Sequence, residues 1–297
     1  MNKLLLAAIV AAVAASAALI VLHGRGGVVH ARVSTTTSLY ATGLLDYLAK
    51  RFEATHPGVR IDFIAVGSGA ALRMAADGEA CMVFVHAPSL EKKYIEEGVL
   101  TGHKIIAYNY FVVVGPPSDP AHVRSAKNAA EAFKRIYEAG EEGKTRFVSR
   151  GDMSGTNVKE LSLWRLAGIN PEELKSKKWY VVSGQGMAQT LVMADQLGAY
   201  TLSDIGTYLK LKKEGRLPHL TVLYSNSTEL INIYSIYLVK GCSGAEARAA
   251  REFYDWVYSH RSLIGSYGVK EYGRPLFYSP VGKEKQLMEI WEELAQG

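Results

Sequence analysis

The chain of 297 residues is long enough to bury a large core and to form two lobes. Its apolar content of 48% and charged content of 21% are typical of a folded globular protein. The net charge of +5 is modest, and the basic residues are scattered, with the densest runs at Lys175–Lys178 and Lys210–Arg216. Neither run contains aromatic residues for base stacking, so we expect solvated helix faces and exclude nucleic acid as a partner.

An apolar segment lies near the start of the chain. Lys3 precedes residues 4–22, which carry no charge and a single hydroxyl at Ser16. This pattern predicts either a cleaved export signal or an uncleaved membrane anchor. Because Lys3 should remain on the cytoplasmic side, we expect the folded part to be extracytoplasmic, in the periplasm or on the outer face of the cell membrane.

The sequence contains two cysteines, Cys81 and Cys242. An oxidising compartment outside the cytoplasm would permit a disulfide between them. Their positions in sequence do not show that their Cα atoms lie within bonding range, so we expect two unrelated buried thiols.

Strand and helix patterns alternate over the first third of the chain. The spacing of Leu44, Leu48 and Phe52 indicates an amphipathic helix, whereas residues 59–66 alternate between apolar and polar as a strand does. This alternation predicts a mostly parallel sheet with helices on both faces. The expected elements are a strand at Val28–Ser34, a helix at Gly43–Ala54, a strand at Val59–Val66, a short helix that ends at Asp77, and a buried strand at Cys81–Val85.

A second set of elements follows an apolar strand at Asn109–Gly115, which ends at Pro116-Pro117. The segment from Asp119 to Lys144 has a charged, helical composition. Beyond it we expect strands at Arg146–Ser149, Trp179–Val182 and Tyr200–Leu202, and helices that end at Ala167, begin at Met187 and span Asp204–Lys212. Another apolar strand at Glu229–Val239 and helices at Ala245–Ser259 and Gly282–Ala295 are then expected.

The two apolar strands predict two crossings between two α/β lobes. Two crossings form a hinge, which suits closure around a ligand. We therefore predict a signal or anchor segment with a linker at 1–27, a first lobe at 28–112 and 226–297, and a second lobe at 113–225.

A run of hydroxyl residues, Ser34-Thr35-Thr36-Thr37-Ser38, follows the first expected strand. A junction between a strand and a helix presents free backbone N–H groups and the positive end of a helix dipole. A single helix cap would need only one hydroxyl. We therefore predict that Thr36, Thr37 and Ser38 bind a small tetrahedral anion.

A second such turn runs from Arg150 to Thr156. Ser154, Gly155 and Thr156 can surround an oxyanion with N–H groups and hydroxyls, and Arg150 adds a fixed positive charge. Asp152 can pair with Arg150, which would fix the guanidinium and reduce its net pull on the ligand. The alternative is a surface turn with an exposed ion pair, which would contribute little.

Two glycine-containing junctions, Gly67-Ser68-Gly69 and Gly184-Gln185-Gly186-Met187, have the same position between a strand and a helix. Glycine lets the backbone approach a ligand closely, so we add Ser68, Gly186 and Met187 to the candidate site; tight turns are the alternative. The eight histidines show no metal-ligand spacing, and His86 is expected to be structural. Since no nucleophile elbow or Walker-type loop occurs either, we predict no catalytic residue, metal or cofactor.

Together these motifs resemble the tungstate-binding proteins of ABC importers, which are extracytoplasmic receptors for a tungstate permease. The resemblance covers nearly the whole mature part and weakens after about Leu230, and its Ser-Arg-Gly-Asp and Gly-Gln-Gly-Met segments are specific in combination. Cys81 departs from the acidic residue expected there, outside the proposed site. The matching residues are Thr35–Ser38, Thr42–Asp46, Ala65–Gly69, Ala71-Leu72, Val85–Pro88, Glu96–Gly98, Tyr108-Asn109, Phe111–Pro116, Phe147–Thr156, Glu160, Gly184–Met187, Ala199–Asp204 and Gly206–Leu209.

The resemblance implies an α/β, two-lobe, type II periplasmic-binding-protein fold, each lobe a mostly parallel sheet flanked by helices. It implies a receptor, not an enzyme, in which the threonine run, Arg150 and the Ser-Gly-Thr turn hold tungstate or molybdate. The ligand would pass to an ABC permease in the membrane. The metal arrives as an oxyanion, so no cofactor is expected, and we expect a monomer.

Other functions remain as alternatives. A phosphate receptor of the same fold would need an acceptor for the proton that phosphate carries near neutral pH, and Asp152 is expected to be occupied by Arg150. Sulfate is fully deprotonated, so the motifs do not exclude it, and the size of the cavity would decide between sulfate and tungstate. A hydrolase would need a base beside Ser38 or Ser154, and no histidine lies near either in sequence. A sensor of oxyanion levels would need a separate signalling partner.

Overall fold

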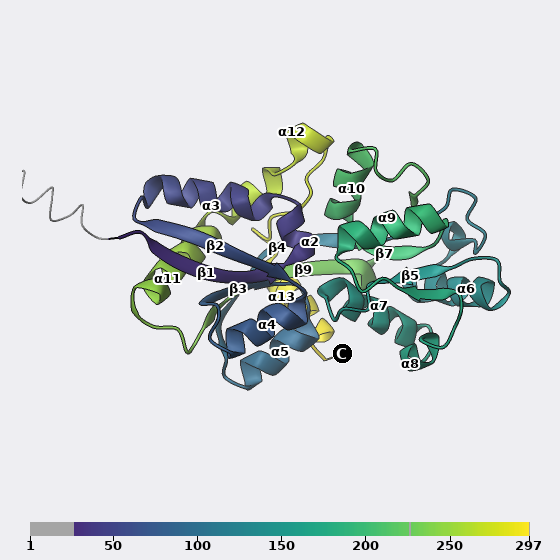
Figure 1. The fold of residues 1–297 in the computed structure, drawn as a ribbon, viewed down its shortest axis with the longest axis horizontal. Coiled ribbons are helices and arrows are strands. Elements are labelled where there is room, and N and C mark those ends of the chain that lie inside the picture. Colours follow the sequence, from purple (N-terminus) through teal and green to yellow (C-terminus); the bar gives the residue numbers. More distant parts are fainter. Residues whose placement is uncertain (1–26, 226, 297) are drawn as a thin grey trace, which may run out of the picture.

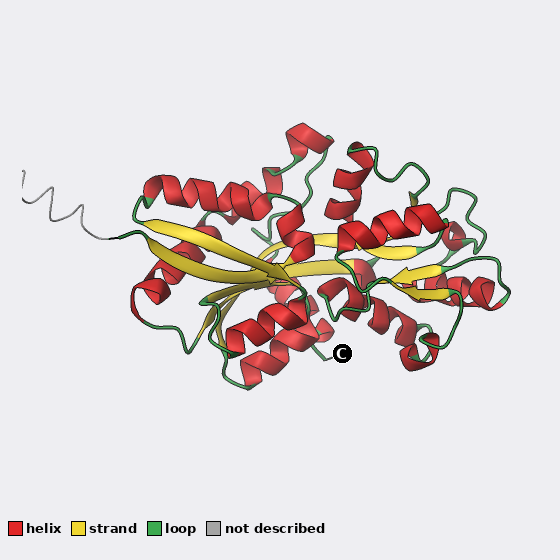
Figure 2. Cartoon of the chain, viewed as in Figure 1, coloured by secondary structure: helices red, strands yellow, loops and turns green. Residues whose placement is uncertain are grey.

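The structure is a computed structural model that describes residues 27–225 and 227–296 (Figures 1 and 2). The expected signal or anchor at 4–22 lies outside these residues. Within the described part of the chain, no helix is both long and apolar enough to cross a membrane. Most of the expected strands and helices are present, with ends within a few residues of those predicted.

Strands of the described residues form one large sheet and one small sheet. The large sheet has the order β2-β1-β3-β9-β4-β7, with β8 also paired to β4, and the small sheet pairs β5 with β6. The strands are β1 (Val29–Thr36), β2 (Val59–Val66), β3 (Met82–Val85), β4 (Leu100–Gly115), β5 (Phe147–Ser149), β6 (Tyr180–Val182), β7 (Thr201–Asp204), β8 (Thr221–Tyr224) and β9 (Ile231–Val239).

The expectation of mostly parallel sheets is wrong for the large sheet. Its strand β1 is parallel to β2 and β3, and β5 is parallel to β6 in the small sheet. Strand β9 is antiparallel to β3 and β4, and β4 is antiparallel to β7 and β8. The cause is that the chain leaves along β4 and returns along β9, so these long neighbours run in opposite directions through the middle of the sheet.

Helices cover the sheets on both faces, as Figure 2 shows. Short 3₁₀ helices accompany them at Val123–Ser125, Thr228–Leu230 and Arg261–Ser266. The α-helices are α2 (Thr37–Ala41), α3 (Leu44–Thr55), α4 (Ser68–Ala76), α5 (Pro88–Glu96), α6 (Ala129–Glu141), α7 (Gly155–Leu166), α8 (Pro171–Leu174), α9 (Met187–Leu197), α10 (Ile205–Lys213), α11 (Gly244–Ser259), α12 (Val269–Tyr272) and α13 (Glu284–Leu294).

Side chains point to alternate faces along β3 and so divide the core of the first group of elements. This group comprises β1, β2 and β3 with helices α3, α4 and α11. Met82 and Phe84 face the helices α3 and α11, where Phe52 and Phe253 pack against each other. Val83 faces the opposite side and packs with α4. Because successive residues of a strand point to opposite faces, one buried strand can anchor helices on both sides.

The same alternation along β4 builds the core of the second group of elements. This group comprises the end of β4 with helices α6, α7, α9 and α10. Phe111 and Val113 belong to a cluster with α6 and α7, whereas Val112 and Val114 belong to a cluster with α9 and α10. Nearer its start, β4 contributes Ile106 to the core beneath α3 and α11. Strand β4 therefore runs from one group of clusters to the other, and Figure 1 shows β9 beside it.

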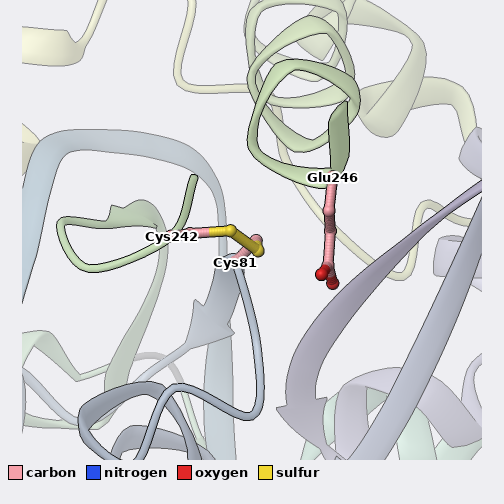
Figure 3. Close-up of side chains that lie close together, drawn as sticks. All are labelled: Cys81, Cys242 and Glu246. Atoms are coloured by element: carbon pink, nitrogen blue, oxygen red, sulfur yellow. A yellow bond between two sulfur atoms is a disulfide. The ribbon is translucent and has the colours of Figure 1, made fainter. Parts of the chain in front are cut away.

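Contrary to expectation, the two cysteines form a disulfide. Cys81 precedes β3 and Cys242 follows β9, and their Cα atoms lie 5.3 Å apart. The antiparallel pairing of β3 with β9 brings them together, since Met82 lies opposite Leu238. Figure 3 shows Glu246 of α11 beside the disulfide. Both sulfur atoms are used in the S–S bond, so this group of three side chains is not a metal site.

Candidate anion-binding site

Four junctions between strands and helices meet where the first and second groups of elements face each other. Arg150 at the end of β5 donates from Nη2 to Thr37 Oγ1 at the start of α2, at 3.3 Å. The backbone N–H of Gly155 at the start of α7 donates to Ser68 Oγ at the start of α4, at 3.1 Å. A Cβ atom at Gly186, the N-cap of α9, would lie 3.6 Å from Thr37 Oγ1. The sequence-predicted residues therefore converge, although far apart in the chain.

Thr36 both ends β1 and caps α2. Its extended backbone has φ −93° and ψ 143°, and Thr36 Oγ1 accepts the N–H of Leu39 at 3.3 Å. Its hydroxyl lies 3.4 Å from Ser38 Oγ. Capping thus accounts for one hydroxyl of the run, and the hydroxyl of Thr37 has Arg150 as its partner.

The turn after Arg150 is built on two left-handed residues, Gly151 with φ +65° and Met153 with φ +54°. A side chain at Gly151 would meet Val182 Cγ1 at 2.3 Å, so both the conformation and the space favour glycine. The turn brings Asp152 Oδ2 to 2.5 Å from Arg150 Nη2, which confirms the predicted ion pair. Asp152 Oδ1 accepts the N–H of Ser154 at 3.2 Å.

Buried donors without partners gather at these junctions. Arg150 is only 2% exposed, yet its Nε and Nη1 atoms have no hydrogen-bond partner among the described residues. The buried hydroxyls of Thr35 and Thr156 also lack one. An unpaired buried donor costs about 1–3 kcal/mol, so a cluster of them predicts a ligand rich in acceptor oxygens.

Helix ends add a favourable field for an anion. Helix α7 begins at Gly155 and helix α9 begins at Met187, and the first N–H groups of a helix form its positive end. Ser154 Oγ caps α7 by accepting the N–H of Asn157 at 3.2 Å. The side chain of Met187 packs in the core beneath α9, so only its backbone remains available to a ligand.

The sequence did not single out the network that supports the Arg150 turn. Glu160 on α7 is buried and accepts hydrogen bonds from Ser149 Oγ at 2.7 Å and Tyr180 Oη at 2.6 Å. The indole of Trp164 donates to Glu160 Oε1 at 3.1 Å. Burial raises the pKa of Glu160. The network fixes the end of β5, and hence the backbone from which the Arg150 side chain extends.

His86 was expected to be structural, but it lies against the candidate site. His86 Nε2 is 3.2 Å from Ser38 Oγ, and His86 Nδ1 is 2.9 Å from Asn232 Oδ1. A Cβ atom at Gly155 would lie 2.6 Å from the His86 carbonyl oxygen, so only glycine lets α7 approach this closely. The position of His86 directly after a buried strand is the signal that could have found it, because the other site junctions also follow strands.

A serine beside a histidine reopens the hydrolase alternative on geometric grounds. The fold supplies the base that sequence proximity did not. Burial, together with the charge of Arg150, lowers the pKa of His86 to about 4, so the imidazole is neutral but a weak base. A general base works best with a pKa near the operating pH, so His86 is poorly suited to activate Ser38 for hydrolysis.

The depressed pKa of His86 predicts a pH dependence of stability. Between pH 6.5 and 4 the unfolded chain binds a proton at this residue and the folded protein does not, so stability falls as the pH falls. We expect a loss of about 2 kcal/mol at pH 5 relative to pH 7. Urea unfolding of wild type and His86→Gln across this range measures it. Subtracting the stability of the variant from that of wild type at each pH removes the contribution of other groups such as Glu160. If the two proteins lost stability in parallel as the pH fell, the prediction would be contradicted.

Comparisons with known proteins identify the family of this chain. Residues 23–261 match the family model of the PBP superfamily domain. The tungstate-binding protein TupA of Peptoclostridium acidaminophilum is 39% identical over 251 residues, which is 82% of this chain and 84% of that protein. The chain belongs to the TupA family of the PBP superfamily. As a member of this family it is a binding protein and not an enzyme.

Two solved structures of the same family resemble most of the described fold. The tungstate ABC transporter protein from Geobacter sulfurreducens is 40% identical with a TM-score of 0.69, and the match covers 80% of this chain and 98% of that chain. TupA from Desulfovibrio alaskensis G20 is 35% identical with a TM-score of 0.67, over 84% of this chain and 98% of that chain. These matches confirm the expected family and its α/β fold.

Proposed function

We propose that this protein is an extracytoplasmic receptor that captures tungstate between two lobes and delivers it to an ABC permease. The observation that carries the proposal is the buried guanidinium of Arg150, whose Nε and Nη1 have no partner in the described part of the chain. Membership of the TupA family, whose named members bind tungstate, supports the choice of ligand. Export or tethering through residues 4–22 would place the receptor outside the cytoplasm.

The proposed lobes are residues 28–112 with 226–297, and residues 113–225. Hydrophobic clusters support this division, because α3, α4 and α11 pack in one set and α6, α7 and α9 in another, while Leu209 of α10 packs against both sets. Strands β4 and β9 connect the two sets and would act as the hinge. Arg150 contacts Thr37 across this division.

In the proposed complex, donors from both lobes surround the anion. Arg150 supplies the charge, Asp152 orients its guanidinium, and hydroxyl and N–H groups supply the remaining hydrogen bonds. A site of neutral dipoles with one partly neutralised charge compensates for the lost hydration of a dianion. The proposed ligand-binding residues are Thr36, Thr37, Ser38, Ser68, Arg150, Ser154, Gly155, Thr156, Gly186 and Met187.

Selectivity against phosphate follows from the state of Asp152. One of its oxygens accepts from Arg150 Nη2 and the other from the N–H of Ser154. A protonated phosphate would need an acceptor that faces it, and these two hydrogen bonds hold both Asp152 oxygens toward the Arg150 turn. Tungstate and molybdate carry no proton near neutral pH and have nearly equal size, so we propose molybdate as a second ligand.

Titration calorimetry of the purified protein with tungstate, molybdate, sulfate and phosphate tests the proposal. We expect tight one-to-one binding of tungstate and weak binding of sulfate and phosphate. Failure of all four anions to bind would overturn the proposed function. Turnover of generic ester substrates that disappears in Ser38→Ala would instead favour the hydrolase alternative.

A further inference from the structure

A chain of hydrogen bonds runs from the crossing strands to the candidate site. Asn109 of β4 donates from Nδ2 to the Leu276 carbonyl at 3.2 Å. Asn232 of β9, directly opposite in the ladder, donates from Nδ2 to Asn109 Oδ1 at 3.0 Å. His86 Nδ1 then lies 2.9 Å from Asn232 Oδ1, and His86 Nε2 lies 3.2 Å from Ser38 Oγ. All four side chains are buried.

The Leu276 carbonyl fixes the direction of this chain. A carbonyl oxygen can only accept, so Asn109 must turn its amide N–H₂ toward Leu276 and its oxygen toward Asn232. Asn232 must then donate to Asn109 and turn its own oxygen toward His86. His86 therefore carries its proton on Nδ1. In a neutral ring the other nitrogen, Nε2, can only accept.

The consequence for Ser38 is that its hydroxyl proton is directed to His86 Nε2. Thr36 Oγ1 accepts the N–H of Leu39, and its own proton is directed to Ser38 Oγ at 3.4 Å. The protons of both hydroxyls are thus committed to this network. Thr37 differs, because its oxygen accepts from Arg150 Nη2 and its proton has no acceptor among the described residues.

We infer that His86 is a positioning residue of the anion site, which holds the Ser38 hydroxyl proton and leaves Thr37 as the hydroxyl donor among Thr36, Thr37 and Ser38. The inference rests on the proposed function. It divides three consecutive hydroxyl residues into two that support the site through His86 and one that donates to the ligand. Any contact of Thr36 and Ser38 with the anion would then be made through their backbone N–H groups.

Nitrogen-15 spectra of the histidine rings test the direction of the chain. We expect His86 to be the Nδ1–H tautomer, both in the ligand-free protein and after saturation with sodium tungstate. Ser38→Ala should shift the Nε2 resonance by removing its donor, whereas Thr37→Val should leave it unchanged. His86→Gln, whose amide oxygen can accept from Ser38, should retain tungstate affinity within about threefold. An Nε2–H tautomer, or an Nε2 resonance that shifts on saturation as it does in Ser38→Ala, would overturn the inference.

Tungstate titrations of Thr37→Val and Ser38→Ala test the division of roles. We expect about a tenfold or greater loss of affinity for Thr37→Val and a clearly smaller loss for Ser38→Ala, whose hydroxyl supports the site without donating to the ligand. Thermal unfolding of both variants checks that each one is folded. Equal losses in the two variants would contradict the inference. If wild type bound no tungstate while His86 kept the Nδ1–H tautomer, the proposed function would fail and the hydrogen-bond chain would stand.

Discussion

Replacement of Arg150 by alanine should weaken tungstate binding by about ten- to a hundredfold. The variant loses a charge-assisted hydrogen bond, worth about 1.5–3 kcal/mol. The loss should be large because Arg150 is buried and two of its nitrogen atoms lack partners within residues 27–225 and 227–296. Titration calorimetry with tungstate at fixed ionic strength measures the change.

Two further variants sharpen this experiment. Arg150→Lys should also bind weakly, because an ammonium cannot reproduce the planar guanidinium, in which Nη2 contacts Asp152 and Thr37 while Nε and Nη1 have no partner among the described residues. Arg248→Ala on the exposed surface of α11 is a matched control that removes the same charge far from the site. Affinity that stays unchanged in Arg150→Ala would remove Arg150 from the site.

Removal of the disulfide should lower the free energy of unfolding by about 2–5 kcal/mol. The effect should lie near the upper end, because Cys81 and Cys242 are separated by 161 residues and the bond restricts a correspondingly large loop in the unfolded chain. Urea unfolding of the oxidised protein and of the Cys81→Ala, Cys242→Ala double variant measures the difference.

Reduction provides the control for the double variant. A thiol reductant should destabilise wild type to the level of the variant and leave the variant unchanged. Tungstate affinity should be the same in both, because Cys81 precedes β3 whereas His86 and the candidate site follow its other end. Equal stability of wild type and variant would show that the bond does not restrict the unfolded chain.

Helices and strands with a regular pattern of apolar residues were predicted accurately. The apolar stripe of α3 and the alternation in β2 gave boundaries within one residue. The first half of β4 was missed because Thr101, Gly102 and Lys104 interrupt the apolar pattern, where the ladder with β9 has a register shift. The helix expected between residues 119 and 144 is only α6, since Asp119 and His122 are left-handed.

The junction residues of the candidate site were predictable because each follows a strand and precedes a helix. Their convergence was not, since it depends on how β1, β5 and α9 are placed by the whole fold. The same limit explains the disulfide and the contact of His86 with Ser38, which join residues distant in sequence. Pairings of this kind are set by sheet order, and a single sequence carries no local signal of it.

The pairing of β4 with β9 has a consequence for protein engineering. Tyr110 and Ile231 lie opposite each other in the ladder, so the chain between them leaves and returns at one place. In topology, residues 111–230 are an insertion in a β-hairpin of the first group of elements. A short turn between these two positions would close that hairpin. A reporter domain could be spliced into the same pair of strands, where bending on ligand capture would be converted into an optical signal.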